Sequence, residues 1–226
     1  MNILLLGRGK TGALVAEVAA RRKHEVMVAG AKDNARAAAL SPDKLRSIDV
    51  VIDFTTPDAV LHNIEACIHA KKSLVVGTSG WYDELPRVRR VVETSGIGFL
   101  YAANFSMGIN LFFDTARNAA AALRHGYSGQ IFERHHAQKK DAPSATALAL
   151  QKIIKESGGT ELEITSFREG DVVGMHELIL DSPNDTIYLC HNAKSRRGFA
   201  EGAVQAAEWL VGKKGFFDFK EVWREI

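Results

Sequence analysis

Cysteine is scarce in this sequence, and the sequence also lacks long apolar runs and a strong net charge. Only two cysteines, Cys67 and Cys190, occur among 226 residues, and their spacing is not that of a metal site. Both fall within segments that we expect to be regular helices or strands. We therefore expect buried thiols in a reducing compartment, and no disulfide.

No segment is long and apolar enough to predict a membrane span. The first apolar run, residues 3–6, is far shorter than the roughly 20 residues that a helix needs to cross a bilayer. It follows Met1 and Asn2 without a basic region or a cleavage site. We therefore expect no signal peptide and a cytoplasmic location.

The sequence also has no marked excess of positive or negative charge. The 29 Lys and Arg residues nearly balance the 27 Asp and Glu residues, which leaves a formal net charge of +2. The basic residues are scattered, and this argues against nucleic-acid binding. With 46% hydrophobic residues, the chain should bury an ordinary core as one large domain or two small ones.

The first half of the chain alternates apolar runs with helical patterns. The apolar runs are residues 3–6, 25–29, 48–54, 73–76 and 98–102. Continuous runs of this kind are typical of strands that are buried on both faces of a parallel sheet. The alternation predicts a doubly wound α/β domain, with Thr56 and Pro57 at the start of the helix after the third run.

A glycine-rich motif follows the first strand. Its residues are Gly7, Arg8, Gly9, Lys10, Thr11 and Gly12, and a helical pattern comes next. A G-x-G-x-x-G in this context predicts a dinucleotide site with the pyrophosphate at the helix N-terminus. The alternative is a strand–helix turn in a protein that binds no nucleotide.

Cofactor preference depends on the end of the second strand. The acidic residue that would bind the ribose is absent there, because Lys32 follows the strand and Asp33 comes one or two positions late. Lys32, with Arg8 or Lys10, would suit a 2′-phosphate, although a solvated Lys32 is the alternative. The choice between NADH and NADPH therefore stays open, with NADPH or dual use favoured.

Several candidate cofactor residues lie at the ends of the later strands and in the loops that follow. They are Phe54 at the end of the third strand, Gly77, Thr78 and Ser79 after the fourth, Ala102 at the end of the fifth, and Ala103, Asn104 and Phe105 after it. Ligands of parallel sheets bind outside the carboxyl ends of the strands. The shared position of these loops favours a cofactor crevice over turn chemistry alone.

The pattern changes after Ser106. The expected elements are a helix near 109–123, strands at 130–133 and 162–167, a hairpin at 177–180 and 187–190, and a helix at 198–211 before an apolar tail that begins at 216–219. We therefore expect a dinucleotide-binding domain at 1–105 that 196–226 completes. Residues 106–195 should form a second α+β domain with a mixed open sheet.

Residues 133–147 combine a strand end, two imidazoles, two lysines and a helix start. Ser144 is placed to cap that helix, whose N-terminus would bind a carboxylate. Lys139 adds a positive charge, and His135 adds a proton that moves near neutral pH. This arrangement predicts a pocket for an acidic substrate that needs acid catalysis. The alternative is a polar loop with solvated lysines.

A metal site is not expected at the paired histidines. His135 and His136 are adjacent on an extended segment, so their side chains should point in opposite directions. The sequence contains no H-E-x-x-H motif and no carboxylate cluster beside them.

The run E-R-H-H-A-Q-K-K-D-A-P-S-A-T-A at 133–147 resembles the E-x-H-H-x-x-K-x-D-A-P-S-G-T-A signature of dihydrodipicolinate reductases. Shorter matches at 77–80, 102–106, 168–176 and 202–209 follow in the family's order and spacing, so the resemblance spans nearly the whole chain. The family implies hydride transfer from NADH or NADPH to a cyclic unsaturated dicarboxylate, with loss of water, in lysine and diaminopimelate biosynthesis. It also implies a homotetramer assembled through the second domain's sheet.

The resemblance also implies roles for individual residues. His135 would be a proton donor or acceptor, and Lys139 a second proton donor. His136, Ser144, Ala145 and Thr146 would bind the substrate, and the loops described above would bind the cofactor. Two departures from the family's pattern are Ala145 in place of a glycine and a first glycine loop that is one residue tighter.

Two other functions are compatible with parts of the sequence. Another two-domain NAD(P)-dependent amino-acid dehydrogenase would not explain the combination of His135 with Lys139. A non-enzymatic dinucleotide-sensing protein would bind the cofactor without turnover.

Overall fold

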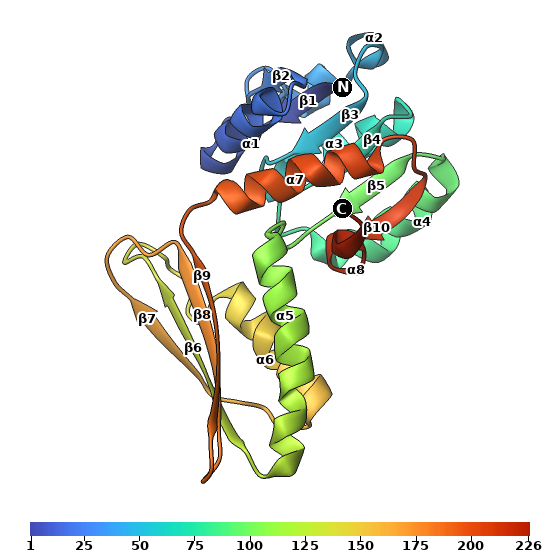
Figure 1. Cartoon of the computed structure of the whole chain (residues 1–226). Helices are drawn as coiled ribbons and strands as arrows, with labels where there is room; N and C mark the ends of the chain where they lie inside the picture. The colour runs from blue at the N-terminus through green and yellow to red at the C-terminus, as the bar shows by residue number, and fades with distance from the viewer. The chain divides into compact units, whose positions relative to one another are not determined.

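The chain divides into two compact units in the computed structural model, which describes all 226 residues (Figure 1). The first unit combines Met1–Met107 with Arg197–Ile226, and the second unit is Gly108–Arg196. None of the helices has the length and apolar character that a membrane span requires. The second unit is thus an insertion between two sequence segments that fold together.

Six parallel strands form the sheet of the first unit. They are β1 (Asn2–Leu6), β2 (Glu25–Ala29), β3 (Val50–Asp53), β4 (Ser73–Val76), β5 (Gly98–Tyr101) and β10 (Gly215–Asp218). Their order is β10-β5-β4-β3-β1-β2, and every neighbouring pair is parallel. The direction of winding reverses between β1 and β3, which confirms the doubly wound Rossmann-type sheet. All loops after the carboxyl ends of the strands share one edge.

Helices cover both faces of this sheet, and each face has its own apolar core. One face carries α1 (Lys10–Arg21) and α7 (Arg197–Leu210), which lie side by side, and the other carries α3 (Pro57–His69) and α4 (Leu85–Ser95) (Figure 1). Alternation along β1 sends Ile3 and Leu5 into the first core and Leu4 and Leu6 into the second. These four side chains are at most 2% exposed. The burial of each contributes roughly 1.5–3 kcal/mol to stability, so β1 anchors both layers.

Short elements complete the first unit. They are a 3-10 helix at Ala35–Leu40, α2 (Pro42–Leu45), a 3-10 helix at Tyr82–Glu84, α8 (Phe219–Val222) and a 3-10 helix at Trp223–Glu225. Arg36 and Ala37 have φ values of 49° and 62°, in the left-handed region. The sequence of this 3-10 helix, ARAAAL at residues 35–40, has no apolar periodicity from which a helix could be predicted.

The second unit packs helices against one face of a four-stranded sheet. The strands are β6 (Ser128–His135), β7 (Ile164–Arg168), β8 (Gly174–Asp181) and β9 (Thr186–Ala193), and the helices are α5 (Met107–Ala119), a 3-10 helix at Ala120–His125 and α6 (Ala145–Gly158). The order is β7-β6-β8-β9, with β6 and β7 parallel and the other two pairs antiparallel. Ile131, Leu150 and Leu178 lie in the core between the sheet and the helices. The mixed open sheet and its hairpin are therefore confirmed.

The prediction of an apolar tail that begins at residues 216–219 is wrong. Residues 215–218 form β10, which pairs with β5 from Gly98 to Tyr101 and extends the sheet by one strand. Phe216 stacks on Phe99, with ring centroids 5.1 Å apart. The strand has four residues, and its partner is more than 100 residues away in the sequence. Local periodicity could not have shown this pairing.

Smaller expectations also need correction. Cys67 is buried, but Cys190 is exposed, because it faces outward on the edge strand β9. Thr56 is the N-cap of α3 by position, yet its side chain makes no capping hydrogen bond. The third and fifth strands are shorter than their apolar runs. The helix expected near 109–123 begins at Met107, ends at Ala119 and continues as a 3-10 helix at Ala120–His125.

Candidate active site

A glycine loop joins β1 to α1 in the first unit. Gly7 has a φ of +104°, and a Cβ there would lie 2.1 Å from the carbonyl oxygen of Phe54. A Cβ at Gly12 would lie 2.4 Å from the carbonyl oxygen of Gly7, so the turn itself requires both glycines. A Cβ at Gly9, the N-cap of α1, would meet nothing within 4 Å. The backbone at Gly9 is therefore open, and the loop fits a pyrophosphate bound by the N–H groups of the helix N-terminus.

Charged side chains surround the end of β2. Arg8, Lys10 and Lys32 are exposed. Asp33 Oδ2 lies 3.1 Å from Arg8 Nη2 and accepts the N–H of Gly30 at 2.9 Å. Asp33 comes late in the sequence for a residue that binds the ribose, but its carboxylate turns back toward the end of β2. An acidic group and basic groups stand together where the ribose of a dinucleotide is expected.

The loops after β3 and β4 meet at a buried carboxylate. Asp53 is 0% exposed, and its Oδ1 accepts the Thr55 hydroxyl and the Thr78 hydroxyl, each at 2.7 Å. Its Oδ2 accepts a hydrogen bond from Asn63 Nδ2 at 2.7 Å. A Cβ at Gly77 would lie 2.3 Å from the ring of Phe54. The Thr78 side chain therefore holds two loops together, and the exposed Ser79 is the residue of this loop that can meet a ligand through its side chain.

The loop after β5 also contains both buried and exposed residues. Ala102 and Phe105 are buried, and the Phe105 ring lies 6.1 Å from that of Phe54. Ala103 is exposed, and Asn104 accepts the N–H of Ser106 at 2.9 Å. The structure thus brings every residue expected at the cofactor to one edge of one sheet. Thr78, Ala102 and Phe105 are buried there and pack beneath the loops at that edge.

In the second unit, Ser144 caps α6. Its hydroxyl accepts the N–H of Ala147 at 3.2 Å, as the sequence predicts. Ala145 and Thr146 begin the helix, so their backbone N–H groups have no partner within it. Ala145 stands in a helical position that any residue can adopt. The replacement of the family's glycine therefore leaves a helix N-terminus that can receive a carboxylate.

A buried ion pair holds His135. His135 Nδ1 contacts Glu133 Oε2, and Glu133 Oε1 lies 2.7 Å from Arg168 Nη2. Glu133 and His135 are two positions apart on β6, so both side chains point to the same face of the sheet. Arg168 also donates to the backbone oxygen of Asp141 at 2.6 Å. The ring of His135 is thus fixed through a carboxylate that is itself held in place.

His176 completes this cluster from β8. In the strand register it lies opposite Glu133, and its ring centroid is 5.2 Å from that of His135. Its Nε2 lies 3.2 Å from Ser144 Oγ. The helix cap and the histidine pair are therefore connected through one hydroxyl.

Lys139 and its neighbours have different environments. Lys139 Nζ lies 2.8 Å from both carboxylate oxygens of Asp141. Lys140 is exposed, and His136 is only half-buried. The ammonium of Lys139 is therefore positioned by Asp141, at the loop that leads to α6.

Burial controls the proton affinities of the cluster. Burial lowers the pKa of His135; the Glu133 carboxylate opposes this shift, and the charges of Lys139 and Arg168 reinforce it. Burial and the charge of His135 lower the pKa of His176 to about 3. Burial alone would raise the pKa of Glu133, but hydrogen bonds from Ser166 and Arg168 and the charge of His135 lower it overall. At neutral pH the cluster holds two neutral imidazoles and one carboxylate.

The cluster also has the spacing of a metal site. Glu133, His135 and His176 each offer one ligand atom, and these atoms lie within 4.8 Å of one another. However, both oxygens of Glu133 already have partners, and one partner is the guanidinium of Arg168. A cation there would be repelled by Arg168. We therefore interpret the cluster as a buried array of ion pairs and polar contacts.

Sequence reasoning missed Glu133, Arg168 and His176 as members of this cluster. Arg168 and His176 lie in a motif that matched the family, but no role was assigned to them. One signal was present for His176, because it alternates in phase with the buried Leu178 and Leu180 on β8. A polar residue on an apolar strand face needs a buried partner.

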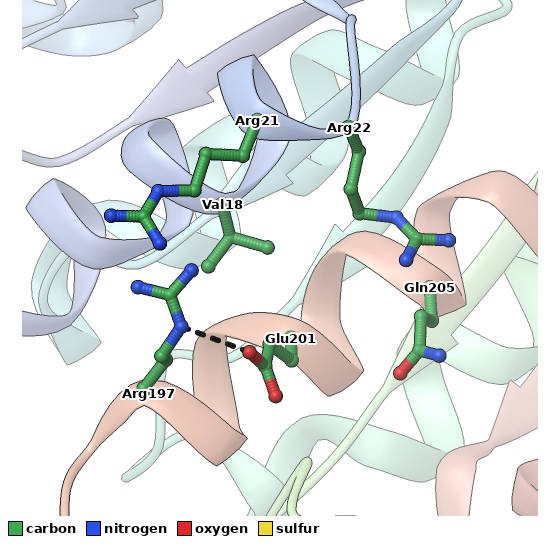
Figure 2. A pocket seen from close by; sticks show the side chains of 6 residues that line it. All are labelled: Val18, Arg21, Arg22, Arg197, Glu201 and Gln205. Carbon is green, nitrogen blue, oxygen red and sulfur yellow. Dashed lines mark hydrogen bonds and ion pairs between the residues drawn. The ribbon is translucent and has the colours of Figure 1, made fainter.

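A hollow of about 160 Å³ lies between α1 and α7, away from the residues described above (Figure 2). Arg21, Arg22 and Arg197 line it, and Figure 2 shows the contact of Arg197 with Glu201, at 2.9 Å. Arg21 pairs with Glu17, and Arg22 pairs with Glu208. Each guanidinium is neutralised within the fold, so this hollow is not a site for an anionic substrate.

Comparison with known proteins gives the same family for both units. A family model described as "Dihydrodipicolinate reductase, N-terminus" matches residues 1–105, and one described as "Dihydrodipicolinate reductase, C-terminus" matches residues 108–223. Between them the two models match most of the sequence.

Curated relatives and a solved structure agree with these models. The chain is 38% identical to a 4-hydroxy-tetrahydrodipicolinate reductase of Christiangramia forsetii, over 100% of this chain and 99% of the relative. It is 35% identical to the enzyme of that name from Neisseria meningitidis, over 79% of this chain and 73% of the relative. A dipicolinate-bound dihydrodipicolinate reductase from Paenisporosarcina sp. TG-14 has the same fold, with a TM-score of 0.83, 23% identity and coverage of 98% and 99%.

Proposed function

Because the chain belongs to the dihydrodipicolinate reductase family, we propose that it reduces 4-hydroxy-tetrahydrodipicolinate to tetrahydrodipicolinate, a step of lysine and diaminopimelate biosynthesis. In this reaction one hydride and one proton enter the substrate, its hydroxyl leaves as water, and the nicotinamide cofactor is oxidised. A bound NADH or NADPH supplies the hydride. The glycine loop at residues 7–12 fits that cofactor, because Gly9 leaves the backbone of the helix N-terminus open.

The cluster around His135 carries the proposal. Hydride addition leaves negative charge on the substrate, and a nearby acid must neutralise it. Lys139 can give up one proton from an ammonium that Asp141 positions at 2.8 Å. His135, neutral and buried, can accept or pass on a proton. We assign proton donation to Lys139, and proton transfer within the site to His135.

The N-terminus of α6 would bind a carboxylate of the substrate. Ser144 caps this helix, and the backbone N–H groups of Ala145 and Thr146 lie in its first turn. Two N–H groups and a helix dipole suit one carboxylate, and the half-buried His136 adds a further donor. The substrate's two acidic groups thus have donors of the right charge in the second unit.

A coupled assay tests this function directly. The substrate is generated enzymatically just before use, and the absorbance of the reduced nicotinamide is followed with NADH and NADPH in parallel reactions. We expect turnover that depends on both substrate and cofactor. Cofactor binding without turnover would instead support a dinucleotide-sensing protein and would contradict the proposal.

Cofactor choice is part of the same measurement. Asp33, held by Gly30 and Arg8, favours a ribose hydroxyl, whereas the exposed Arg8 and Lys32 favour a 2′-phosphate. We propose that both cofactors are used. Lys32→Ala should lower kcat/KM for NADPH several-fold and leave that for NADH unchanged, since only NADPH carries the additional charge.

We further propose a cytoplasmic homotetramer. The sheet face opposite α5 and α6 carries Phe132, Phe167, Ile179 and Tyr188, and Phe167 and Tyr188 are 39% and 54% exposed. Another copy of this chain would cover that face and the edge strand β9. Light scattering should give the mass of four chains, and Tyr188→Glu should reduce it. Val91→Glu, at an exposed residue of α4, is the control and should keep the mass unchanged.

A further inference from the structure

We propose that Glu133, clamped by Arg168, is a positioning residue that fixes the tautomer of His135, with the proton on Nδ1 and Nε2 left for the reaction. This inference rests on the proposed function, since it assigns to His135 a proton-transfer role in that reaction. Glu133 itself touches neither substrate nor cofactor in this proposal.

The first argument is the geometry of the carboxylate. Glu133 is 1% exposed, and its two oxygens have separate partners: Oε2 contacts His135 Nδ1, and Oε1 lies 2.7 Å from Arg168 Nη2. A carboxylate oxygen can only accept a hydrogen bond, so in this close contact we place the proton of the neutral ring on His135 Nδ1, beside the carboxylate. A neutral imidazole has one N–H, and Nε2 is therefore the free acceptor.

The second argument is that Arg168 prevents the carboxylate from turning. In the parallel register of β6 and β7, Arg168 lies opposite His135. Its guanidinium also donates to the backbone oxygens of Asp141 and Phe167, each at 2.6 Å. Three acceptors fix its planar donor set, and one of them is Glu133. The Arg168–Glu133–His135 chain therefore has one arrangement rather than several.

The third argument is the space beside Nε2. A Cβ built on Gly174 would lie 3.0 Å from His135 Nε2, closer than ordinary van der Waals contact. The absence of a side chain at Gly174 keeps that nitrogen uncovered. Nδ1 is closed by Glu133, and Nε2 is open, as a ring that passes protons on one side requires.

Glu133 and Arg168 should shift the titration of His135 in opposite directions. The Glu133 carboxylate raises the pKa of His135 against the effect of burial, and the Arg168 charge lowers it. A loss of the carboxylate should therefore move the His135 limb of the pH profile to lower pH. A loss of the guanidinium should move it to higher pH. A purely structural role would not produce two opposite shifts.

The test compares Glu133→Gln, Arg168→Gln and the control Glu169→Gln. Glu169 is adjacent to Arg168, but its side chain forms an exposed ion pair with Arg134. For Glu133→Gln we expect kcat to fall on the order of 10- to 100-fold with little change in KM, by analogy with the partners that orient metal-binding histidines. Glu133→Asp should recover part of the loss. Glu169→Gln should match the wild type in kcat, KM and pH profile.

Nitrogen NMR of the wild-type protein tests the tautomer without any turnover. The expected spectrum of His135 at neutral pH has a protonated Nδ1 and an unprotonated Nε2, and Glu133→Gln should show a mixture. A wild-type His135 protonated at Nε2 would overturn the inference, as would an unchanged kcat and pH profile in Glu133→Gln. If Glu133→Gln does not fold, the wild-type spectrum and the pH profile of Arg168→Gln still test the tautomer of His135.

Failure of this inference is separable from failure of the proposed function. If the wild-type chain does not turn over the substrate, the proposed function is wrong whatever the tautomer of His135. If it turns over and Glu133→Gln does so equally well, only the positioning role is wrong.

Discussion

Ser144 Oγ lies 3.2 Å from His176 Nε2 and also accepts the N–H of Ala147 at 3.2 Å. One buried hydroxyl therefore caps α6 and contacts the histidine cluster on the sheet. Through this contact, the start of the helix and the cluster around His135 depend on each other. The orientation of the helix N–H groups is thus tied to the residues that we propose to move protons.

Ser144→Ala should weaken both stability and substrate binding. The loss of an N-cap costs about 1 kcal/mol, and His176 Nε2 would also lose a buried partner. Thermal unfolding should show a lower Tm, and the KM for substrate should rise. Ser157→Ala, near the other end of α6, serves as the control and should show neither effect.

Ser144→Asp separates the two effects. Aspartate caps helices well, so most of the stability should return. Its negative charge would stand beside the proposed carboxylate site and keep the KM high. A variant with normal KM would show that substrate does not bind at this helix end.

Lys139→Ala should abolish reduction and leave nucleotide affinity nearly intact. The reason is that Lys139 is the proposed proton donor, and the cofactor residues lie in the first unit. The neighbouring Lys140→Ala is the matched control, because Lys140 is exposed and has no proposed role. Steady-state kinetics and a fluorescence titration with NADPH provide the measurements. Normal turnover by Lys139→Ala would refute the assignment of the donor.

Gly9→Ala should lose cofactor affinity without losing stability. A methyl group at Gly9 meets no protein atom within 4 Å, and its φ of −71° suits alanine. It would stand where we expect the pyrophosphate. Titration should give a Kd for NADH raised on the order of tenfold or more, which corresponds to about 1.4 kcal/mol, and the Tm should be unchanged. Gly7→Ala, in contrast, should destabilise the apoprotein, because its Cβ would meet the Phe54 carbonyl at 2.1 Å.

The stability of the protein should fall on acidification, in part because of His176. Its pKa is about 3 in the folded protein, compared with an ordinary value of 6.5. Between these values the unfolded chain binds the proton and the folded chain does not, so stability declines as pH falls from about 6.5 toward 3, by at most roughly 1.4 kcal/mol per pH unit. Urea unfolding at several pH values should show a smaller slope for His176→Gln. His125→Gln, at an exposed position, should keep the wild-type slope.

The sequence predicted features that depend on local patterns. The run Ile3-Leu4-Leu5-Leu6 identified a strand with two buried faces, and Ser144 identified a helix start, since both signals lie within a few residues. The family signature identified His135 and Lys139, but their roles remain predictions. Strand ends were predicted less accurately, because apolar residues such as Ile48 are buried although they lie outside the strand.

The features that the sequence did not predict depend on pairing between distant segments. Glu133 and Arg168 meet because β6 pairs with β7, and Glu133 lies opposite His176 because β6 pairs with β8. Asp33 was judged too late in the sequence, since the turn that brings its carboxylate back to the Gly30 N–H has no local signature. Cys190 was expected to be buried, because nothing in its own strand shows that β9 is an edge.

The strand β10 has a consequence for biosynthesis of the chain. The first unit needs residues 197–226 for α7 and for the strand beside β5. On the ribosome, its first 107 residues emerge with one sheet face uncovered by α7 and one strand edge unpaired. The second unit is continuous and can close first during translation, whereas the first unit can close only after residues 197–226 have emerged. A premature stop after residue 196 would therefore leave a complete second unit joined to an aggregation-prone partial sheet.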